Sequence, residues 1–167
     1  MRWHVTIFGI VAAAALQISL LPAAAGQWLT EREPELGFAF SYPAELFQEI
    51  EGDGKPSFHY FASPSSDAKF LVGGWNNQAA QSPERFKQWL IANAGGYDDA
   101  TYRPRGRSWF VLSGYRGDKI YYEKVMFSCR GTLVNVFAIT YPVAERDLFD
   151  PIVERMEDTF RPGRRCS

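Results

Sequence analysis

Six segments of the chain have the apolar pattern of β-strands. In the first of them, 36–42, every second residue is large and apolar, which is typical of a strand with one buried face. The other five strands are expected at 58–62, 69–75, 109–115, 120–129 and 132–141. Short glycine-containing turns join the last three of these strands, so we expect those three to form an antiparallel meander.

Two helices are predicted, one before the meander and one after it. Ser82 and Pro83 are typical of the N-cap and the first position of a helix, and apolar residues then recur at helical spacing up to Gly95. The second helix is expected over 144–160, where apolar residues again share one face. The order of these elements predicts an α+β fold rather than a parallel sheet, because strands come first, then a helix, then the strand meander and a second helix.

The long middle strand of the meander, 120–129, is apolar on both of its faces. Tyr121 and Val125 fall on one face, whereas Ile120 and Met126 fall on the other. A sheet that is apolar on both faces must be covered on both. We therefore expect a single antiparallel sheet with a helix on each face.

Residues 1–25 have the pattern of a secretory signal peptide. Arg2 precedes a long apolar run, and Ala23 and Ala25 supply the small residues that signal peptidase accepts. We expect cleavage after Ala25; an uncleaved membrane anchor is the alternative. The mature part, 26–167, is then expected to be one domain without a membrane span, located in the periplasm or secreted.

The two cysteines of the chain, Cys129 and Cys166, both lie in the mature part. An even number of cysteines in an exported protein predicts one disulfide, because the compartment is oxidising. Two free thiols are the alternative. A zinc site is not indicated, since no histidine lies at ligand spacing from either cysteine.

The composition and net charge of the chain indicate which classes of molecule it is not expected to bind. The chain has 18 Lys and Arg residues against 19 Asp and Glu, which gives a net charge of -1. Nucleic-acid binding depends on a basic excess that displaces counterions, so we expect no nucleic-acid partner. The acidic pair Asp98 and Asp99 lacks the spacing of a calcium loop, and we expect neither a metal nor a cofactor.

Four segments, with the order of the elements, resemble small exported bacterial proteins of uncharacterised function that have a PsbP-like fold. The segments are 38–43, 109–114, 141–142 and 150–160. The extrinsic PsbP subunit of photosystem II and a small Ran-binding nuclear transport protein share this fold. The resemblance implies an antiparallel sheet between helices and a role as a binding or accessory subunit rather than an enzyme. No binding residue of PsbP can be assigned to a position of this chain on the basis of this resemblance.

A catalytic site is only weakly indicated. His59 is the one histidine of the mature part, and a hydrolase would pair it with Ser113 and an acid such as Asp118. The Gly-x-Ser-x-Gly signature is absent, because Val111 stands two positions before the serine. We therefore predict no catalytic residue, and an envelope hydrolase that uses Ser113 and His59 remains the alternative.

Two groups of residues are candidates for ligand binding. Arg103, Arg105 and Arg107 alternate beside Trp109 and would present guanidinium groups to an anion if the backbone were extended. Proline and glycine between the arginines favour a solvated loop instead.

The second group is Trp75 with Asn76, where a large ring precedes amide side chains, as in carbohydrate and peptide sites. An ordinary exit from a strand explains the pair equally well. Together these observations predict an exported, non-enzymatic binding or accessory domain that acts on an envelope partner or a small ligand.

Overall fold

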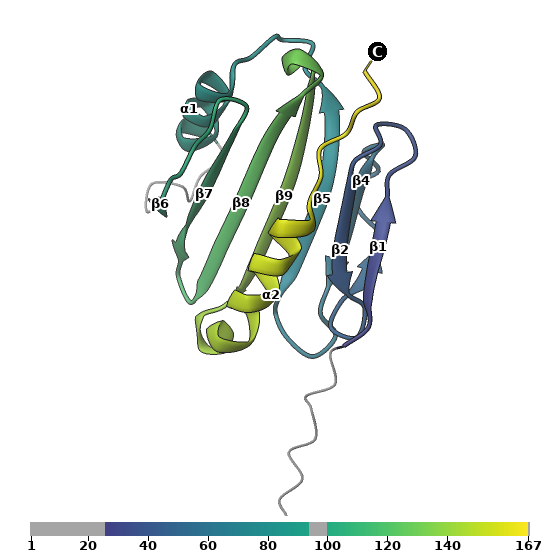
Figure 1. Ribbon diagram of the computed structural model, residues 1–167. Helices are drawn as coiled ribbons and strands as arrows, with labels where there is room; N and C mark the ends of the chain where they lie inside the picture. Colours follow the sequence, from purple (N-terminus) through teal and green to yellow (C-terminus); the bar gives the residue numbers. More distant parts are fainter. Residues whose placement is uncertain (1–25, 94–99, 167) are drawn as a thin grey trace, which may run out of the picture.

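The computed structural model describes residues 26–93 and 100–166, and its main feature is a seven-stranded antiparallel sheet (Figure 1). The predicted signal peptide, residues 1–25, lies outside the described residues. The strands are β3 (Gln48–Ile50), β4 (Phe58–Ala62), β5 (Lys69–Asn76), β6 (Ala100–Tyr102), β7 (Trp109–Arg116), β8 (Lys119–Ser128) and β9 (Leu133–Pro142). Their order across the sheet is β3-β4-β5-β9-β8-β7-β6.

The predicted meander is confirmed. Strands β7, β8 and β9 are joined by short turns and pair over their whole length, and β8 and β9 are in register from Lys119 opposite Pro142 to Ser128 opposite Leu133. A 3₁₀ turn, Cys129–Gly131, joins β8 to β9. The short edge strands β3 and β6 have no sequence pattern of their own, because three residues are too few to show alternation.

The prediction of a single sheet is wrong, because the first predicted strand belongs to a second, two-stranded sheet. Strand β2 (Ala39–Pro43) pairs antiparallel with β1 (Trp28–Arg32) and not with the main sheet. All of β2 is buried, whereas β1 is mostly exposed and polar. The polar segment 28–32 therefore carries no apolar alternation that could have predicted its pairing.

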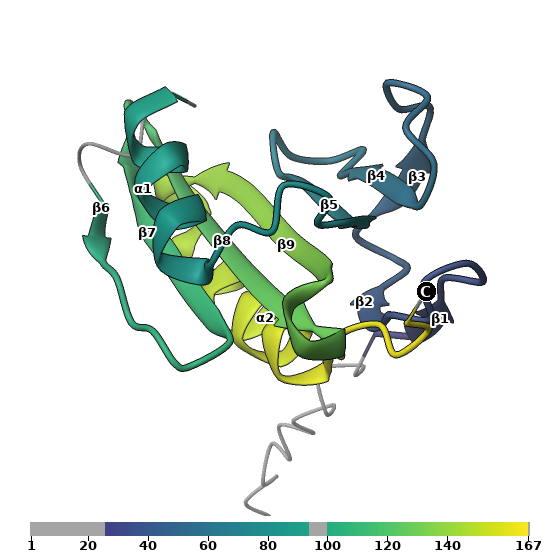
Figure 2. The same ribbon diagram turned by 90° about the horizontal axis from the view of Figure 1, so that it is seen from above.

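The two predicted helices are present, as α1 (Pro83–Asn93) and α2 (Arg146–Thr159), on opposite faces of the main sheet (Figure 2). Helix α2 begins after a 3₁₀ turn, Val143–Glu145, and packs on β2 and β9. Helix α1 packs on β7 and β8. The segment that follows α1, including the predicted stop at Gly95, lies outside the described residues.

Buried side chains form two clusters, one on each face of the main sheet. Ile120 and Met126 belong to the cluster on the face that carries α2 and β2, whereas Tyr121 and Val125 belong to the cluster on the face that carries α1. The predicted division of the middle strand between two faces is therefore confirmed. Phenylalanine rings fill much of the first cluster, including Phe38, Phe40, Phe47, Phe61, Phe70, Phe137, Phe149 and Phe160.

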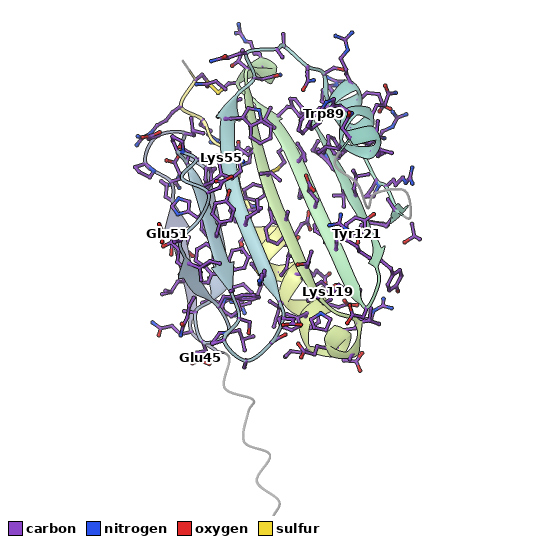
Figure 3. All side chains as sticks on the ribbon, turned by 180° about the vertical axis from the view of Figure 1, so that it is seen from behind. Glu45, Glu51, Lys55, Trp89, Lys119 and Tyr121 are labelled. Carbon is purple, nitrogen blue, oxygen red and sulfur yellow. A yellow bond between two sulfur atoms is a disulfide. The ribbon has the colours of Figure 1, made fainter. Side chains whose placement is uncertain are left out.

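The expectation of a helix over each whole face holds only in part. On the first face, α2 shares the cover with β1 and β2, and strands β6 and β7 extend beyond it (Figure 1). On the second face, Trp89 marks α1 at one end of the sheet, while Tyr121 and Lys119 lie toward the other end, beyond the helix (Figure 3). An 11-residue helix is about 17 Å long, which is too short to follow strands of ten residues at about 3.4 Å per residue.

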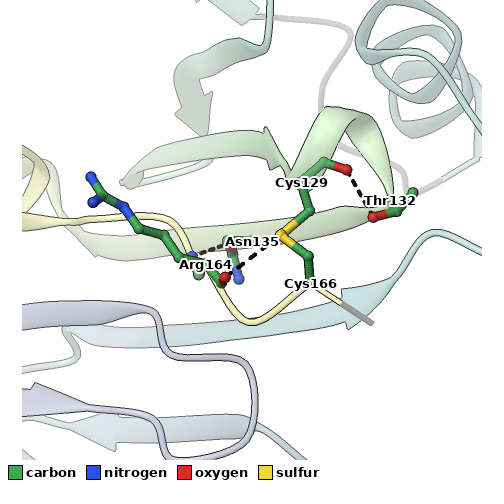
Figure 4. Close-up of a disulfide and its surroundings, with 6 residues drawn as sticks. Cys129, Thr132, Asn135, Arg164 and Cys166 are labelled. Carbon is green, nitrogen blue, oxygen red and sulfur yellow. Dashed lines mark hydrogen bonds between the residues drawn. A yellow bond between two sulfur atoms is a disulfide. The ribbon is translucent and has the colours of Figure 1, made fainter.

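The predicted disulfide is confirmed: Cys129 and Cys166 are bonded, with 5.4 Å between their Cα atoms (Figure 4). It fastens the C-terminal segment to the end of β8. The amide of Gly163 donates to the Asn135 side chain over 2.9 Å, and a Cβ atom at Gly163 would lie 2.4 Å from the carbonyl oxygen of Leu36. Glycine is therefore required where this segment crosses the sheet.

Among the residues that the structure describes, no helix has both the length and the apolar character that a membrane crossing requires.

Candidate ligand-binding site

A cavity of about 530 Å³ lies where α2 leaves strands β6 to β8 uncovered. We call it the tyrosine cavity, because Tyr102, Tyr115, Tyr122 and Tyr141 line it. Its volume falls in the range of small-molecule sites, roughly 300–1,000 Å³. Polar side chains also line it: Ser113 on the sheet and Arg146, Asp150, Glu154 and Glu157 on α2.

Strand alternation and register bring the four tyrosines together from four strands. Tyr115 lies two residues after Ser113 on β7, so both point to the same face of the sheet. Ser113 is opposite Tyr122 of β8 and opposite Tyr102 of β6. Tyr141 of β9 is opposite Ile120, two residues from Tyr122.

The cavity has an exposed outer part and a more enclosed inner part. Tyr102 and Tyr115, near the edge of the sheet, are 57% and 44% exposed. Tyr122 is half-buried and Tyr141 is buried. Burial, followed by the nearby Glu157 carboxylate, raises the pKa of Tyr122, and burial with a hydrogen bond to Asp150 raises the pKa of Tyr141. Both inner phenols therefore stay protonated and neutral at physiological pH.

Two of the three carboxylates of the tyrosine cavity are held by contacts within the protein. Asp150 accepts hydrogen bonds from the Tyr141 hydroxyl at 2.7 Å and from Nε of Arg146 at 2.8 Å. Glu157 pairs with the ammonium group of Lys124. Glu154 is exposed, and among the described residues no hydrogen bond or ion pair engages its carboxylate.

These tyrosines could not be predicted as a group, because no pattern along the chain reveals which strands lie side by side. A signal was nevertheless present on α2. Arg146, Asp150 and Glu154 follow one another at intervals of four residues, which places three charged side chains on one helix face. Only the apolar face of this helix was used to predict its packing.

The hydrolase pairing is not formed in the structure. His59 lies on β4 and Ser113 on β7, and three strands lie between them, so about 19 Å separates the two strand axes at a spacing of about 4.8 Å. The Ser113 hydroxyl donates to the carbonyl of Tyr121 at 2.8 Å, and Nδ1 of His59 is 2.9 Å from the Glu49 carboxylate. The two side chains cannot act together as nucleophile and base.

The three arginines proposed as an anion site do not present their guanidinium groups together. Arg103 donates to the carbonyl of Ala100 at 2.7 Å, and Arg105 pairs with Glu84 at 2.8 Å. Arg105 and Arg107 line a separate cavity of about 290 Å³, together with Glu84 and Trp109. The Glu84 carboxylate neutralises Arg105 there, so an anion would meet one balanced ion pair and Arg107 rather than three convergent guanidinium groups.

Trp75 and Trp109 lie on opposite faces of the main sheet, so the two predicted groups are separate. Trp75 packs between Phe58 and Phe86, with ring centroids 6.1 and 5.6 Å away, and Asn76 is the exposed last residue of β5. A Cβ atom at Gly73 would lie 2.4 Å from the Phe58 ring, so a glycine leaves room for that ring to lie over the strand.

A further, smaller hollow of about 190 Å³ lies on the face that α1 leaves partly uncovered. We call it the apolar hollow; Ile50, Tyr60, Leu71 and Ala138 are among its lining residues.

In the described part of the chain, no group of three histidine, cysteine, aspartate or glutamate side chains is placed to hold a metal ion.

Comparisons with known proteins relate this fold to solved structures. No family model matches the chain, and no curated protein matches its sequence. The solution structure of cyanobacterial PsbP (CyanoP) from Synechocystis sp. PCC 6803 is similar, with a TM-score of 0.61 and 11% identity over 85% of this chain and 97% of that one. The Ran-binding protein Mog1p of Saccharomyces cerevisiae has a TM-score of 0.55 and 7% identity over 83% and 96% of the two chains.

A crystal structure from Bacteroides thetaiotaomicron has a TM-score of 0.51 and 16% identity, and the match covers 84% of this chain but only 49% of that one. At these identities the similarity concerns the fold alone. The seven-stranded antiparallel sheet, the two helices and these structural neighbours establish that the chain has a PsbP-like fold.

Proposed function

We propose that this protein is an exported, non-enzymatic binding or accessory domain of the cell envelope, and that the tyrosine cavity is its binding site. The main support for this proposal is the presence of the cavity. It combines a volume suited to a ligand or to side chains of a partner with two exposed aromatic rings, Tyr102 and Tyr115. Exposed aromatic residues of this kind are enriched where proteins bind their partners.

The polar groups of the cavity support binding rather than catalysis. The Ser113 hydroxyl is engaged by a backbone carbonyl, and the histidine that could activate it lies on β4. Asp150 is held between Arg146 and Tyr141. A general base must reach the proton it removes within hydrogen-bond distance, and the Ser113 proton is directed to the Tyr121 carbonyl rather than to a carboxylate of the cavity.

Export is supported by the cysteines and by the sequence of the N-terminus. A disulfide such as Cys129–Cys166 persists in oxidising compartments and is rare in the cytosol. Residues 1–25 have the composition of a cleaved signal peptide. The fold adds a precedent for protein binding, since one structural neighbour is described as a Ran-binding protein.

The test is a quantitative pull-down from envelope extract with the oxidised mature protein, residues 26–167. The comparison is between wild type, the double variant Tyr102→Ala/Tyr115→Ala, and a control, Leu29→Ala, which removes an exposed apolar side chain from β1. We expect the double variant to lose recovered partner or ligand by roughly tenfold or more, because two aromatic anchors are removed. The control should recover as much as wild type.

Equal recovery by all three proteins would refute the tyrosine cavity as the binding site. The hydrolase alternative has its own outcome. If the purified protein turns over an ester or a glycoside, and Ser113→Ala abolishes that turnover, the protein is an enzyme and the proposal fails.

A further inference from the structure

Resting on the proposed function, we propose that the tyrosine cavity selects an organic cation, that is, an ammonium or guanidinium group. The group can belong to a small amine or to a lysine or arginine side chain of a partner. Three features support this ligand chemistry: the aromatic rings, the balance of charge, and the one carboxylate that the protein leaves without a partner.

The rings supply a surface that attracts positive charge. The face of a phenol ring carries the negative part of its quadrupole, and a cation within about 6 Å of the ring centroid is attracted to it. Tyr102 and Tyr115 are about half exposed and can be reached from solvent. The fold already uses this contact elsewhere, since the guanidinium carbon of Arg155 lies 4.0 Å from the centroid of the Trp28 ring.

The charges of the lining favour a cation over an anion. Three carboxylates line the tyrosine cavity, on Asp150, Glu154 and Glu157, against one guanidinium on Arg146. Arg146 is held by Asp150, and Glu157 by Lys124, so these four charges balance in pairs. Glu154 is left as the carboxylate available to an incoming charge. An anion would meet this unbalanced carboxylate and be repelled.

A neutral polyol could use the same hydroxyl and carboxylate oxygens for hydrogen bonds, so the test must separate charge from shape. Nα-acetyl-arginine amide carries one guanidinium group. Nα-acetyl-citrulline amide has nearly the same shape but replaces that group with a neutral urea. Titration calorimetry of both compounds against the mature protein measures how much the charge contributes. We expect the arginine compound to bind about tenfold more tightly, which is the size of a partly desolvated cation–π contact.

Two variants place that preference in the tyrosine cavity. Tyr115→Leu removes an aromatic face but keeps an apolar side chain, and Glu154→Gln removes the unpaired charge but keeps the shape. Both positions are exposed, so neither substitution should disturb folding. Each should lower the affinity for the arginine compound by about threefold to tenfold. Glu51→Gln, an exposed carboxylate on the loop after β3, is the matched control and should leave the affinity unchanged.

A second comparison identifies the source of the cation. n-Propylguanidine has the arginine side chain without the peptide groups, carries one positive charge like the acetylated arginine amide, and represents a free small cation. Tighter binding of n-propylguanidine than of the acetylated arginine amide indicates a small ligand, whereas the opposite order indicates a side chain on a partner chain. Either order supports an organic cation as the ligand of the tyrosine cavity.

Equal binding of the arginine and citrulline compounds would overturn the inference, and so would affinities that neither Tyr115→Leu nor Glu154→Gln changes. Absence of binding at ligand concentrations of about 10 mM would overturn it too. These outcomes are distinct from failure of the proposed function. If partner recovery in the pull-down still depends on Tyr102 and Tyr115, the cavity remains the proposed binding site, and only the proposal that its ligand is a cation is refuted.

Discussion

Glu33 shows at the scale of one residue how this fold holds a buried charge. It lies between β1 and β2 and is only 3% exposed. Its carboxylate accepts hydrogen bonds from the backbone amides of Glu35 and Leu36 and from the Ser57 hydroxyl. Burial opposes the charged form, but these donors outweigh it together, so the pKa of Glu33 is lowered below its ordinary value of 4.5. The ionised carboxylate therefore closes the turn between the two strands.

Glu33→Gln is expected to lower the free energy of unfolding by about 1–3 kcal/mol near neutral pH, because an amide cannot accept all three hydrogen bonds. The pKa is lower in the folded than in the unfolded state. The stabilisation by Glu33 is thus fully present above pH 4.5 and is lost as the pH falls through the folded-state pKa. Urea unfolding of wild type and variant between pH 7 and pH 3 measures the difference.

The difference between wild type and Glu33→Gln should shrink on acidification, and Glu51→Gln should show no comparable change. A difference that stays constant over the whole pH range would mean that the carboxylate is not stabilised as described.

The alternation of residue types predicted the packing of the middle strand. Tyr121, Val125 and Ile120 fall on the faces that alternation assigns to them, since the period of a strand is a local property. The arginine site required an extended backbone to bring three guanidinium groups together, whereas in the structure Arg103 and Arg105 engage separate partners, so ligand binding there stays a prediction.

At the scale of elements, the disulfide holds together parts of the chain that the sheet alone does not join. The C-terminal segment runs from Phe160 along β2, where Arg161 bridges to Ala39, and then reaches Cys129 at the end of β8. It thereby ties the two-stranded sheet to the main sheet. Cysteine count predicted this bond, but only the structure relates it to β1 and β2.

Removing the bond with Cys129→Ser/Cys166→Ser should lower the free energy of unfolding by about 4 kcal/mol, because the bond closes a loop with a sequence separation of 37. Urea denaturation of oxidised wild type and of the double variant measures the change. Dithiothreitol should destabilise wild type by a similar amount and leave the variant unchanged. A reductant effect on both proteins, or on neither, would contradict this role of the disulfide.

At the scale of the whole molecule, each face of the main sheet is covered incompletely and by different elements. Helix α2 and the two-stranded sheet cover the first face up to the tyrosine cavity, whereas α1 packs on β7 and β8 of the second face, away from the apolar hollow on β3, β4, β5 and β9. Helical spacing predicted the two helices, and the resemblance of four segments, with the order of the elements, implied the PsbP-like fold. The uncovered regions depend on helix length and on strand order across the sheet, which hydrophobic patterning does not encode.

The proposed export concerns the whole chain, and it predicts a definite mass. Expressed at full length in a Gram-negative host, the protein should be recovered from the periplasm as residues 26–167, with the mass lowered by two hydrogens for the disulfide. Intact mass spectrometry under non-reducing conditions measures both features. Retention of residues 1–25, or two cysteines that can be alkylated in the native protein, would contradict export with oxidation.

Site-specific photo-crosslinking in living cells tests binding at the tyrosine cavity most directly. A benzophenone amino acid is placed at one of three exposed positions: Tyr115 in the tyrosine cavity, Ile50 at the apolar hollow, or Leu29 on β1. Mass spectrometry then identifies what becomes attached at each. We predict a discrete adduct at Tyr115 that is absent at Ile50 and Leu29; adducts only at Ile50 or Leu29, or the same adducts at all three, would contradict the account.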